Sequence, residues 1–416
     1  MRTDVVVTGL GAVTPLGADA TSTWEALFAG CTGVRVLTEP AFADLPVRLA
    51  APVRADPAAG LTRTMARRLD RYQQLAMTAA MEAWRDCGLA DLAGTADAVP
   101  GDRIAVSIGS CVGGLTSMLD TWDTMQAKGS RHVSPFTIPR ILPDGAASWV
   151  GLEIGARAAI HTPVAACATG NDAIRQGVET IRGGLADVVL AGAAEACIHP
   201  IILAGFASMR ALSQRHDQPG SASRPFDEER DGFVLGEGAG MLVLESASHA
   251  RRRGARIYAE LAGTGSSADS HDFAQPDPTG AGQMAAMDRA LRDAGLALPE
   301  INHISAHAAS TPSGDAAEAL SIRTVLGSHT DDVVIAAPKS AMGHLMGAAG
   351  AVESLLAVLT LHHRVVPPTA NLDRMGEGID LDVAREPRHL PGGALAALSN
   401  SFGLGGHNVI VALRSV

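Results

Sequence analysis

A strand–turn–helix unit that occurs twice is the strongest constraint on how this chain can fold. In the first copy, a short apolar strand leads into a small-residue turn at 165–170, and apolar residues then recur at helical spacing through Ile174, Val178 and Ile181. The second copy runs from a strand at 333–336 through a Gly/Ala-rich turn into an apolar helix at 351–361. Matching units in two halves that alternate strands and helices predict an internally duplicated α/β fold.

The composition is consistent with two large packed halves, which we expect to span residues 1–256 and 257–416. A chain of 416 residues exceeds one ordinary hydrophobic core. Hydrophobic residues make up 47% of the chain but aromatic residues only 3%, and there are 45 glycines. We therefore expect helices and strands that pack closely through small side chains.

Charge and cysteine content exclude several classes of protein. The formal net charge of −11 argues against a general nucleic-acid binder. The five cysteines are scattered and form no CxxC pair, so neither a zinc ribbon nor a disulfide scaffold is indicated, and a reducing cytoplasm fits best. The N-terminal sequence lacks the apolar core of a signal peptide, and no run of about 18 uncharged apolar residues predicts a transmembrane helix.

Cys167 lies in the turn of the first unit, at the start of the predicted helix. Free N–H groups and the positive end of the helix dipole would favour its thiolate, and the small neighbours Ala166, Ala168 and Gly170 would leave room for a substrate. The alternative is a buried structural cysteine. Cys111, in another glycine-rich turn, lacks a recognisable base nearby, and we interpret it as mostly structural.

Three further strand ends carry candidate functional groups: His307, Lys339 with His344, and Phe402 within a glycine loop. Loops at one edge of an α/β sheet converge in space, which is where such folds bind ligands. A nucleophilic cysteine needs a base or a cation, and two histidines can donate hydrogen bonds to one carbonyl oxygen. The serine-hydrolase GxSxG, zinc-protease HExxH and phosphate-loop GxxxxGK[ST] motifs are absent.

Four sequence blocks resemble the signature blocks of the β-ketoacyl-acyl-carrier-protein synthases; they lie at 166–170, 307–315, 339–350 and 400–406. They resemble the elongating Cys-His-His type, which is found in bacterial type II fatty-acid and polyketide assembly. The similarity extends along nearly the whole chain. The resemblance implies a thiolase fold, with a duplicated five-layered αβαβα core. It also implies a dimer, either a homodimer or a heterodimer with a homologous ketosynthase-like subunit.

The resemblance also implies roles for individual residues. Cys167 would take the acyl chain as a thioester, while His307 and His344 would bind the thioester carbonyl of malonyl-carrier protein and support its decarboxylation. Lys339 would support the electrostatics around His344, and the backbone N–H groups of Cys167 and Phe402 would form the oxyanion hole. We assign Asp315 and Glu318 instead to a structural capping box at a helix start.

Around this centre, the resemblance implies a gate, a pocket and a docking surface. Phe402 and Phe233 would gate the entrance, and Ala309 departs from the family pattern at the pantetheine arm. The substrate pocket would include Val112, Ser310, Thr311 and Leu404. Basic residues that would meet the acidic carrier protein are Arg67, Arg68, Arg71, Lys128, Arg131 and Arg215. A solvated basic face is the alternative interpretation of this set.

The expected activity is decarboxylative Claisen condensation in type II fatty-acid synthesis. No bound cofactor or metal is expected, because the substrates are carried on the phosphopantetheine of acyl carrier protein. The alternative is the ketosynthase subunit of a type II polyketide synthase, paired with a partner that lacks the cysteine and resembles a chain-length factor. Cys167 weighs against a non-catalytic partner subunit, and the lack of a second cysteine within 399–407 weighs against a degradative thiolase.

Overall fold

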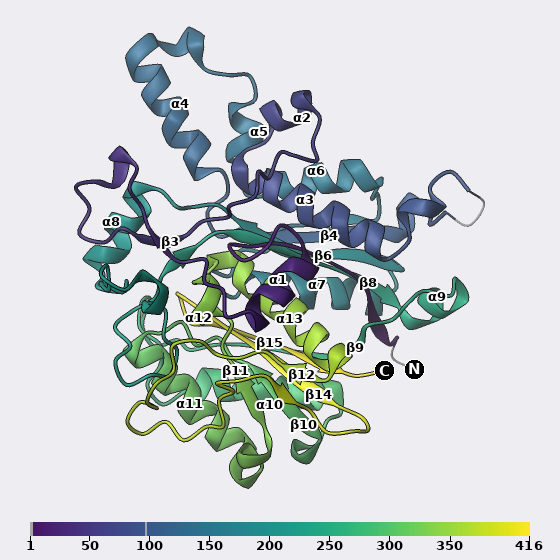
Figure 1. The fold of residues 1–416 in the computed structure, drawn as a ribbon. Helices are drawn as coiled ribbons and strands as arrows, with labels where there is room; N and C mark the ends of the chain where they lie inside the picture. The colour runs from purple at the N-terminus through teal and green to yellow at the C-terminus, as the bar shows by residue number, and fades with distance from the viewer. Residues whose placement is uncertain (1–2, 96–97) are drawn as a thin grey trace.

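The computed structural model describes residues 3–95 and 98–416. Ten strands of these ranges form one mixed sheet with two similar halves (Figure 1). The first half contains β1 (Val5–Val13), β4 (Ile104–Gly109), β5 (Ala159–His161), β6 (Val188–Glu195) and β8 (Gly238–Ser246). The second half contains β9 (Ala259–Ala268), β10 (Ile301–Ser305), β11 (Val334–Ala336), β14 (Ala396–Gly403) and β15 (His407–Arg414).

The two halves have the same topology, which confirms the predicted duplication. Their strand orders are β5-β4-β6-β8-β1 and β11-β10-β14-β15-β9. If the strands of each half are numbered along the chain, both orders read 3-2-4-5-1. The pairing directions also agree: strands 3-2 and 2-4 are parallel, whereas 4-5 and 5-1 are antiparallel. The halves meet where β1 pairs antiparallel with β9.

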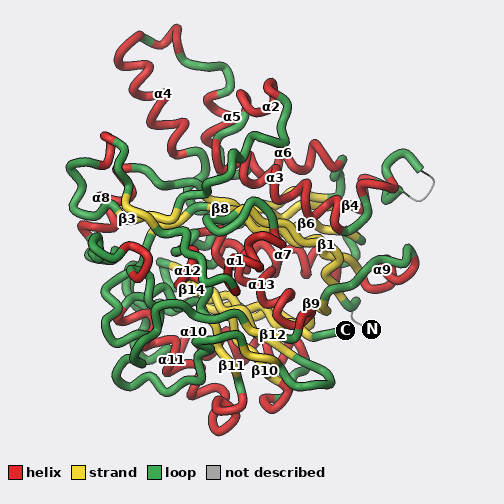
Figure 2. The backbone as a smooth tube through the Cα atoms, in the orientation of Figure 1, coloured by secondary structure: helices red, strands yellow, loops and turns green. Residues whose placement is uncertain are grey.

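Helices complete a five-layered arrangement (Figure 2). Between the two halves of the sheet lie α7 (Thr169–Arg182) and α13 (Ala349–His363), and one hydrophobic cluster joins both helices to both halves. On the outer faces, α3 (Arg71–Asp86) and α6 (Gly145–Ile154) cover the first half, while α10 (Ala281–Ala294) and α11 (Pro312–Leu326) cover the second. One cluster therefore fills both spaces beside the central layer, and each outer helix layer packs on a cluster of its own.

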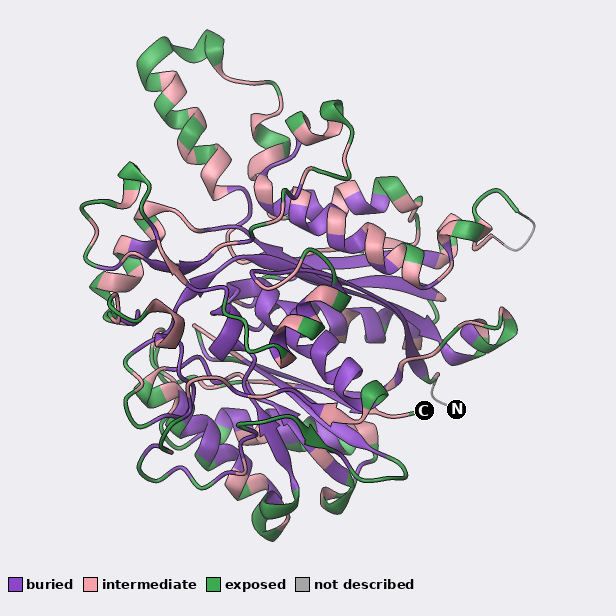
Figure 3. Cartoon of the chain, viewed as in Figure 1, coloured by how far each residue is buried: buried purple, intermediate pink, exposed green. Residues whose placement is uncertain are grey.

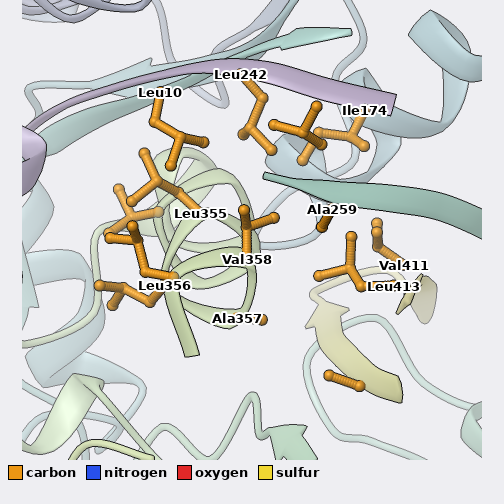
Figure 4. Packing of buried hydrophobic residues seen from close by; sticks show 14 of the residues in the cluster. Leu10, Ile174, Leu242, Ala259, Leu355, Leu356, Ala357, Val358, Val411 and Leu413 are labelled. Carbon is orange, nitrogen blue, oxygen red and sulfur yellow. The ribbon is translucent and has the colours of Figure 1, made fainter. Parts of the chain in front are cut away.

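The central layer is the most thoroughly buried part of the chain (Figure 3). Every residue of α13 from Ala349 to Leu361 is buried. Figure 4 shows leucine and valine side chains of this helix among those of the strands on either side. Small residues allow the close approach: a β-carbon at Gly240 of β8 would lie 2.6 Å from the backbone nitrogen of Val352. The expected packing through small side chains is thus present at the centre of the molecule.

The remaining elements are short or peripheral. The other helices are α1 (Ala20–Phe28), α2 (Arg63–Arg68), α4 (Leu115–Lys128), α5 (Thr137–Ile141), α8 (Pro200–Ser208), α9 (Ala247–Arg252) and α12 (Lys339–Met342). The other strands are β2 (Arg35–Val36), β3 (Leu49–Ala51), β7 (Leu235–Gly236), β12 (Val365–Val366) and β13 (Arg388–His389). In Figure 1, α4 projects from the body of the molecule, and none of its residues is buried.

Local contacts set the bounds of three elements in the first half. The strand β1 continues to Val13, and its glycines allow α3 to pack closely; a β-carbon at Gly11 would lie 2.0 Å from the Ala79 carbonyl oxygen. The N-cap of α1 is Asp19, whose carboxylate accepts a hydrogen bond from the Ser22 N–H. The helices α2 and α3 are separate, because the chain is extended at Asp70, which caps α3.

No helix within the described ranges combines the length and the apolar character needed to cross a membrane.

Replacement of Gly240 by alanine tests the close packing of the central layer. The added methyl group would collide with the α13 backbone, and overpacking of a core typically costs about 1–3 kcal/mol. We expect Gly240→Ala to lower the free energy of unfolding, measured by urea titration, by about that amount. Gly60→Ala is the matched control, because nothing lies within 4 Å of a β-carbon there. Equal stability of the two variants would contradict the packing argument.

Candidate active site

The four predicted turns converge on one cavity of about 210 Å³. Its lining includes Cys167, His307, His344 and Phe402, which come from four chain segments far apart in the sequence. Cys167 precedes the central helix α7, His307 follows β10, His344 follows α12, and Phe402 lies near the end of β14. The second half of the chain thus supplies three of these groups, and they face the cysteine of the first half.

Cys167 lies two residues before the first residue of α7, in a tight turn, and is 7% exposed. Burial raises the pKa of its thiol to about 11, although the positive charge of Lys339 and a hydrogen bond from the Leu404 backbone act in the opposite direction. The expectation that the helix start favours the thiolate is therefore wrong, because desolvation outweighs it. Because its pKa is raised, the Cys167 side chain is a neutral thiol at neutral pH.

His307 and His344 lie together, with ring centroids 5.3 Å apart and ring planes nearly perpendicular at 88°. Burial, and then the positive charge of Lys339, hold the pKa of each imidazole well below its usual range. Both rings are therefore neutral near pH 7, so each carries one N–H donor and one acceptor nitrogen. The Nδ1 atom of His307 lies 3.5 Å from the Lys339 ammonium, which assigns the ring proton of His307 to Nε2.

A buried ion pair fixes the position of Lys339 beside the histidines. Lys339 Nζ lies 2.5 Å from the Oε1 atom of Glu353, and both side chains are 1% exposed. Glu353 belongs to the central helix α13, so the pair fixes the lysine relative to the core. Burial raises the pKa of Glu353 to about 7, against the effect of the lysine charge. Lys339 contacts His307 directly, whereas it acts on His344 through its charge.

Glu318, which we predicted to be part of a capping box, holds the His307 turn instead. Its carboxylate accepts hydrogen bonds from the backbone N–H of His307 at 2.9 Å, from that of Ala308 at 2.7 Å and from the Asn400 amide at 3.0 Å. Asp315 accepts hydrogen bonds from the Phe226 N–H at 2.8 Å and from the N–H of Thr311, the N-cap of α11, at 3.2 Å. The predicted pairing of Asp315 with Glu318 in a capping box was wrong, because the helix begins earlier, at Thr311, and Glu318 faces the His307 turn.

The entrance to the cavity is bordered by aromatic rings. Phe233 packs edge-on against His344, with 5.5 Å between the ring centroids. Phe402 also packs edge-on against His307, with 5.8 Å between the ring centroids. Thr311 and Leu404 line the cavity, as the resemblance implied. The predicted loop over 399–407 is largely a hairpin, because β14 continues to Gly403 and β15 begins at His407.

Two predicted pocket residues do not line this cavity. Ser310 is fully buried with a φ of +70°, and its hydroxyl accepts a hydrogen bond from the Arg224 N–H, so its role is to shape the turn. Val112 is half-buried and packs against the hydrophobic cluster that contains Cys167 and Phe233.

The six predicted docking residues divide into two groups. Arg67, Lys128 and Arg131 are exposed and have no ion-pair partner within residues 3–95 and 98–416, and the Arg68 guanidinium lies over the Phe136 ring at 5.2 Å. Arg71 and Arg215 are engaged within the chain by carboxylates and backbone carbonyls; the partners are Glu237 and Val53 for Arg71, and Glu229 for Arg215.

Sequence reasoning missed one basic residue at the mouth. Arg210 is exposed, lines the cavity entrance and has a φ of +56°. It follows α8, and no spacing in the sequence distinguishes it from other surface arginines. Among the described residues, no group of three or more His, Cys, Asp or Glu side chains could hold a metal ion.

Comparison with known proteins gives consistent matches. The family model described as beta-ketoacyl synthase, N-terminal domain, matches residues 2–250, and that of the C-terminal domain matches residues 258–373. The chain is 42% identical over 412 residues to 3-oxoacyl-[acyl-carrier-protein] synthase 2 of Mycobacterium tuberculosis, covering 98% of this chain and 96% of the relative. It is 40% identical over 414 residues to the protein of the same name from Coxiella burnetii, covering 99% and 98%.

Solved structures give the same result. The chain is similar to the ketosynthase of a type II polyketide synthase in complex with its acyl-carrier protein, with a TM-score of 0.91 and 31% identity. It is also similar to the ishigamide ketosynthase/chain length factor, with a TM-score of 0.91 and 30% identity. Each comparison covers 100% of both chains.

The pH dependence of Cys167 alkylation follows from the buried neutral thiol. Because iodoacetamide reacts with the thiolate, and the pKa of Cys167 is raised to about 11, the alkylation rate should rise roughly tenfold per pH unit from pH ~7 to ~10. The rate is measured by mass spectrometry of the Cys167 peptide. Exposed Cys31 provides an internal reference for the reagent. A rate that reaches a plateau near neutral pH would contradict the assignment.

Proposed function

The chain belongs to the β-ketoacyl synthase family, and on that premise we propose that it is an elongating 3-oxoacyl-acyl-carrier-protein synthase of type II fatty-acid synthesis. It transfers an acyl chain to Cys167 and joins it to a malonyl unit by decarboxylative Claisen condensation. The observation that carries this proposal is the single cavity in which Cys167 faces the neutral pair His307 and His344.

Acyl transfer begins with attack of the Cys167 sulfur on the thioester carbonyl of the incoming acyl group. The thiol proton passes to the departing pantetheine thiolate, and an acyl-Cys167 thioester forms. The backbone N–H groups of Cys167 and Phe402 are assigned as donors to the developing oxyanion. The close passage of the adjoining strand supports this assignment, because a β-carbon at Gly403 would lie only 3.0 Å from the backbone nitrogen of Cys167.

Condensation then uses the two histidines as neutral hydrogen-bond donors. Their N–H groups hold the thioester carbonyl oxygen of the malonyl substrate, which stabilises the enolate formed when carbon dioxide leaves. The enolate carbon attacks the acyl-Cys167 carbonyl, a carbon–carbon bond forms, and the cysteine sulfur leaves and regains a proton. The Lys339 ammonium holds His307 in the tautomer that donates through Nε2.

The substrates are carried on the phosphopantetheine of acyl carrier protein, which docks beside the cavity entrance. Arg67, Arg68, Lys128 and Arg131 form the proposed docking surface. Its support is that Arg67, Lys128 and Arg131 are exposed and Arg68 is partly exposed, on α2 and near the tip of α4. We remove Arg71 and Arg215 from the set given by the resemblance, because both are held by internal carboxylates. Reversal of the charge at Arg71 would leave the buried Glu237 unpaired and disturb the fold.

A dimer is part of the proposal. The strand β5 lies at the outer edge of the sheet, where its backbone groups can pair with another chain. Exposed apolar side chains lie near this edge: Ile160 is 45% exposed, Val164 56% and Leu152 72%. A second copy of the chain would cover this edge in a homodimer.

The alternative function is that of the ketosynthase subunit of a type II polyketide synthase, paired with a partner that lacks the cysteine. The similarity to the ishigamide ketosynthase/chain length factor favours it. The mass of the purified assembly distinguishes the two possibilities: a functional homodimer supports fatty-acid synthesis, whereas activity that requires a homologous partner supports the polyketide role.

Substitution of Cys167 tests the function. Cys167→Ala should abolish acyl-enzyme formation and condensation. Cys167→Gln should also lose condensation but should decarboxylate malonyl-carrier protein faster than the wild type, because the amide mimics the acylated cysteine. Addition of His307→Ala to Cys167→Gln should lower that decarboxylation about 10²-fold or more, the scale of losing one oxyanion donor. Condensation by Cys167→Ala, measured as 3-oxoacyl product, would refute the proposal.

Charge reversal at Arg67 tests the docking surface. Arg67→Glu should raise KM for carrier-borne substrates several-fold and weaken the salt dependence of binding, while leaving turnover of a soluble pantetheine thioester unchanged. Arg292→Glu is the matched control, because Arg292 is exposed on α10, on the opposite outer layer of the molecule (Figure 1). An equal rise in KM for both substrate types would mean that Arg67 does not act by binding the carrier protein.

A further inference from the structure

The residue before the nucleophile has a strained backbone. Ala166 has a φ of +48°, in the left-handed region that residues with a β-carbon rarely adopt. Such a conformation persists only where the surroundings hold it, and it often marks a functional turn. Because Ala166 sets the direction in which Cys167 leaves the turn, the contacts that hold Ala166 decide where the nucleophile points.

Three donors converge on the carbonyl oxygen of Ala166. The backbone N–H of Thr169 lies 3.1 Å from it, and the Thr169 hydroxyl lies 2.7 Å from it. That hydroxyl also accepts a hydrogen bond from the Ala165 N–H at 2.9 Å, so its own proton is free to go to Ala166. The third donor is the thiol of Cys111, with its sulfur 2.8 Å from the same oxygen. Cys111 is the only one of the three donors that comes from outside the turn and its helix.

A buried carboxylate fixes the position of Cys111. Glu195, at the end of β6, is fully buried and accepts hydrogen bonds from the Cys111 N–H at 2.7 Å and from the Ser110 hydroxyl at 2.8 Å. It also accepts from the Gly347 N–H at 3.2 Å, in the segment that follows His344. The loop that bears Cys111 is therefore tied to the sheet and to the histidine side of the cavity.

The thiol of Cys111 is a hydrogen-bond donor rather than a second nucleophile. A carbonyl oxygen can only accept, so the S–H bond must point to Ala166. Burial, and then the negative charge of Glu195, raise the pKa of Cys111 well above its usual range, which keeps the sulfur protonated. The proton needed for the hydrogen bond is thus retained at neutral pH.

We propose that Cys111 is a positioning residue for the nucleophile: its S–H group holds the Ala166 carbonyl and thereby keeps the strained turn in the geometry that directs Cys167 into the cavity. Cys111 touches neither the substrate nor the reacting atoms in this proposal. The inference deepens the proposed function and rests on it only for the readouts that use carrier-borne substrates.

The test compares Cys111→Ala with Cys111→Ser, which retains a donor at the same place. A typical hydrogen bond contributes about 1 kcal/mol, which corresponds to roughly a fivefold change in rate. We expect Cys111→Ala to slow both the alkylation of Cys167 by iodoacetamide and its acylation by acyl-carrier protein about fivefold. Cys111→Ser should restore most of both rates. In the Cys167→Ala background, where no side chain is left to position, Cys111→Ala should leave malonyl decarboxylation unchanged, since the histidines carry that step.

Cys197→Ala is the matched control, because Cys197 is buried in the same hydrophobic cluster without a hydrogen bond from its thiol to the turn. Three results would overturn the inference: wild-type rates in Cys111→Ala, equal slowing in the alanine and serine variants, or equal slowing in Cys197→Ala. Slower alkylation in Cys111→Ala, combined with a wild-type protein that does not condense, would refute the proposed function while supporting the positioning role.

Discussion

The ion pair between Lys339 and Glu353 is the interaction on which the active site depends. Both groups are buried, so removal of either would leave an uncompensated charge in the core, typically a loss of about 3–5 kcal/mol. Glu353 belongs to the fully buried helix α13, and the lysine charge reaches both imidazoles. The most thoroughly buried layer of the protein therefore helps to set the charge state of the two side chains that are proposed to stabilise the enolate. Burial alone would lower their pKa values, and the fixed cation lowers them further.

The duplicated fold explains how one cavity acquires two kinds of chemistry. Both halves place a turn and a helix at equivalent positions around the central layer, but the first half presents a thiol and the second presents imidazoles and an ammonium group. The thiol of Cys167 is buried and neutral, and in the proposed mechanism it remains so until a thioester carbonyl reaches the oxyanion donors. Fixed donors need no reorganisation during the reaction, which is where catalysis by preorganised dipoles gains its advantage. Buried carboxylates without catalytic contacts, Glu195 and Glu318, hold the turns in place.

Sequence reasoning located the groups that have a local sequence pattern. It missed the residues whose role depends on which way the side chain points and on distant partners in the chain. Cys167, His307, Lys339 and His344 lie in turns between apolar segments, and the duplication follows from two matching units. Glu318 has the spacing of a helix cap, and only the three-dimensional structure shows that it faces the His307 turn. Arg71 belongs to a basic run, yet Glu237, which pairs with it, is 166 positions further along the chain. Nothing local predicts that the Cys111 thiol meets the Ala166 carbonyl.

His307 and His344 are proposed to act as neutral donors that the Lys339 charge keeps neutral. The most direct test is the ¹⁵N NMR spectrum of histidine-labelled protein between about pH 5.5 and 8, where an ordinary imidazole would titrate, with assignment by single substitutions. We expect both rings to stay neutral across this range and His307 to carry its proton on Nε2. Titration of either ring near 6.5, the usual pKa of histidine, would contradict the proposed role.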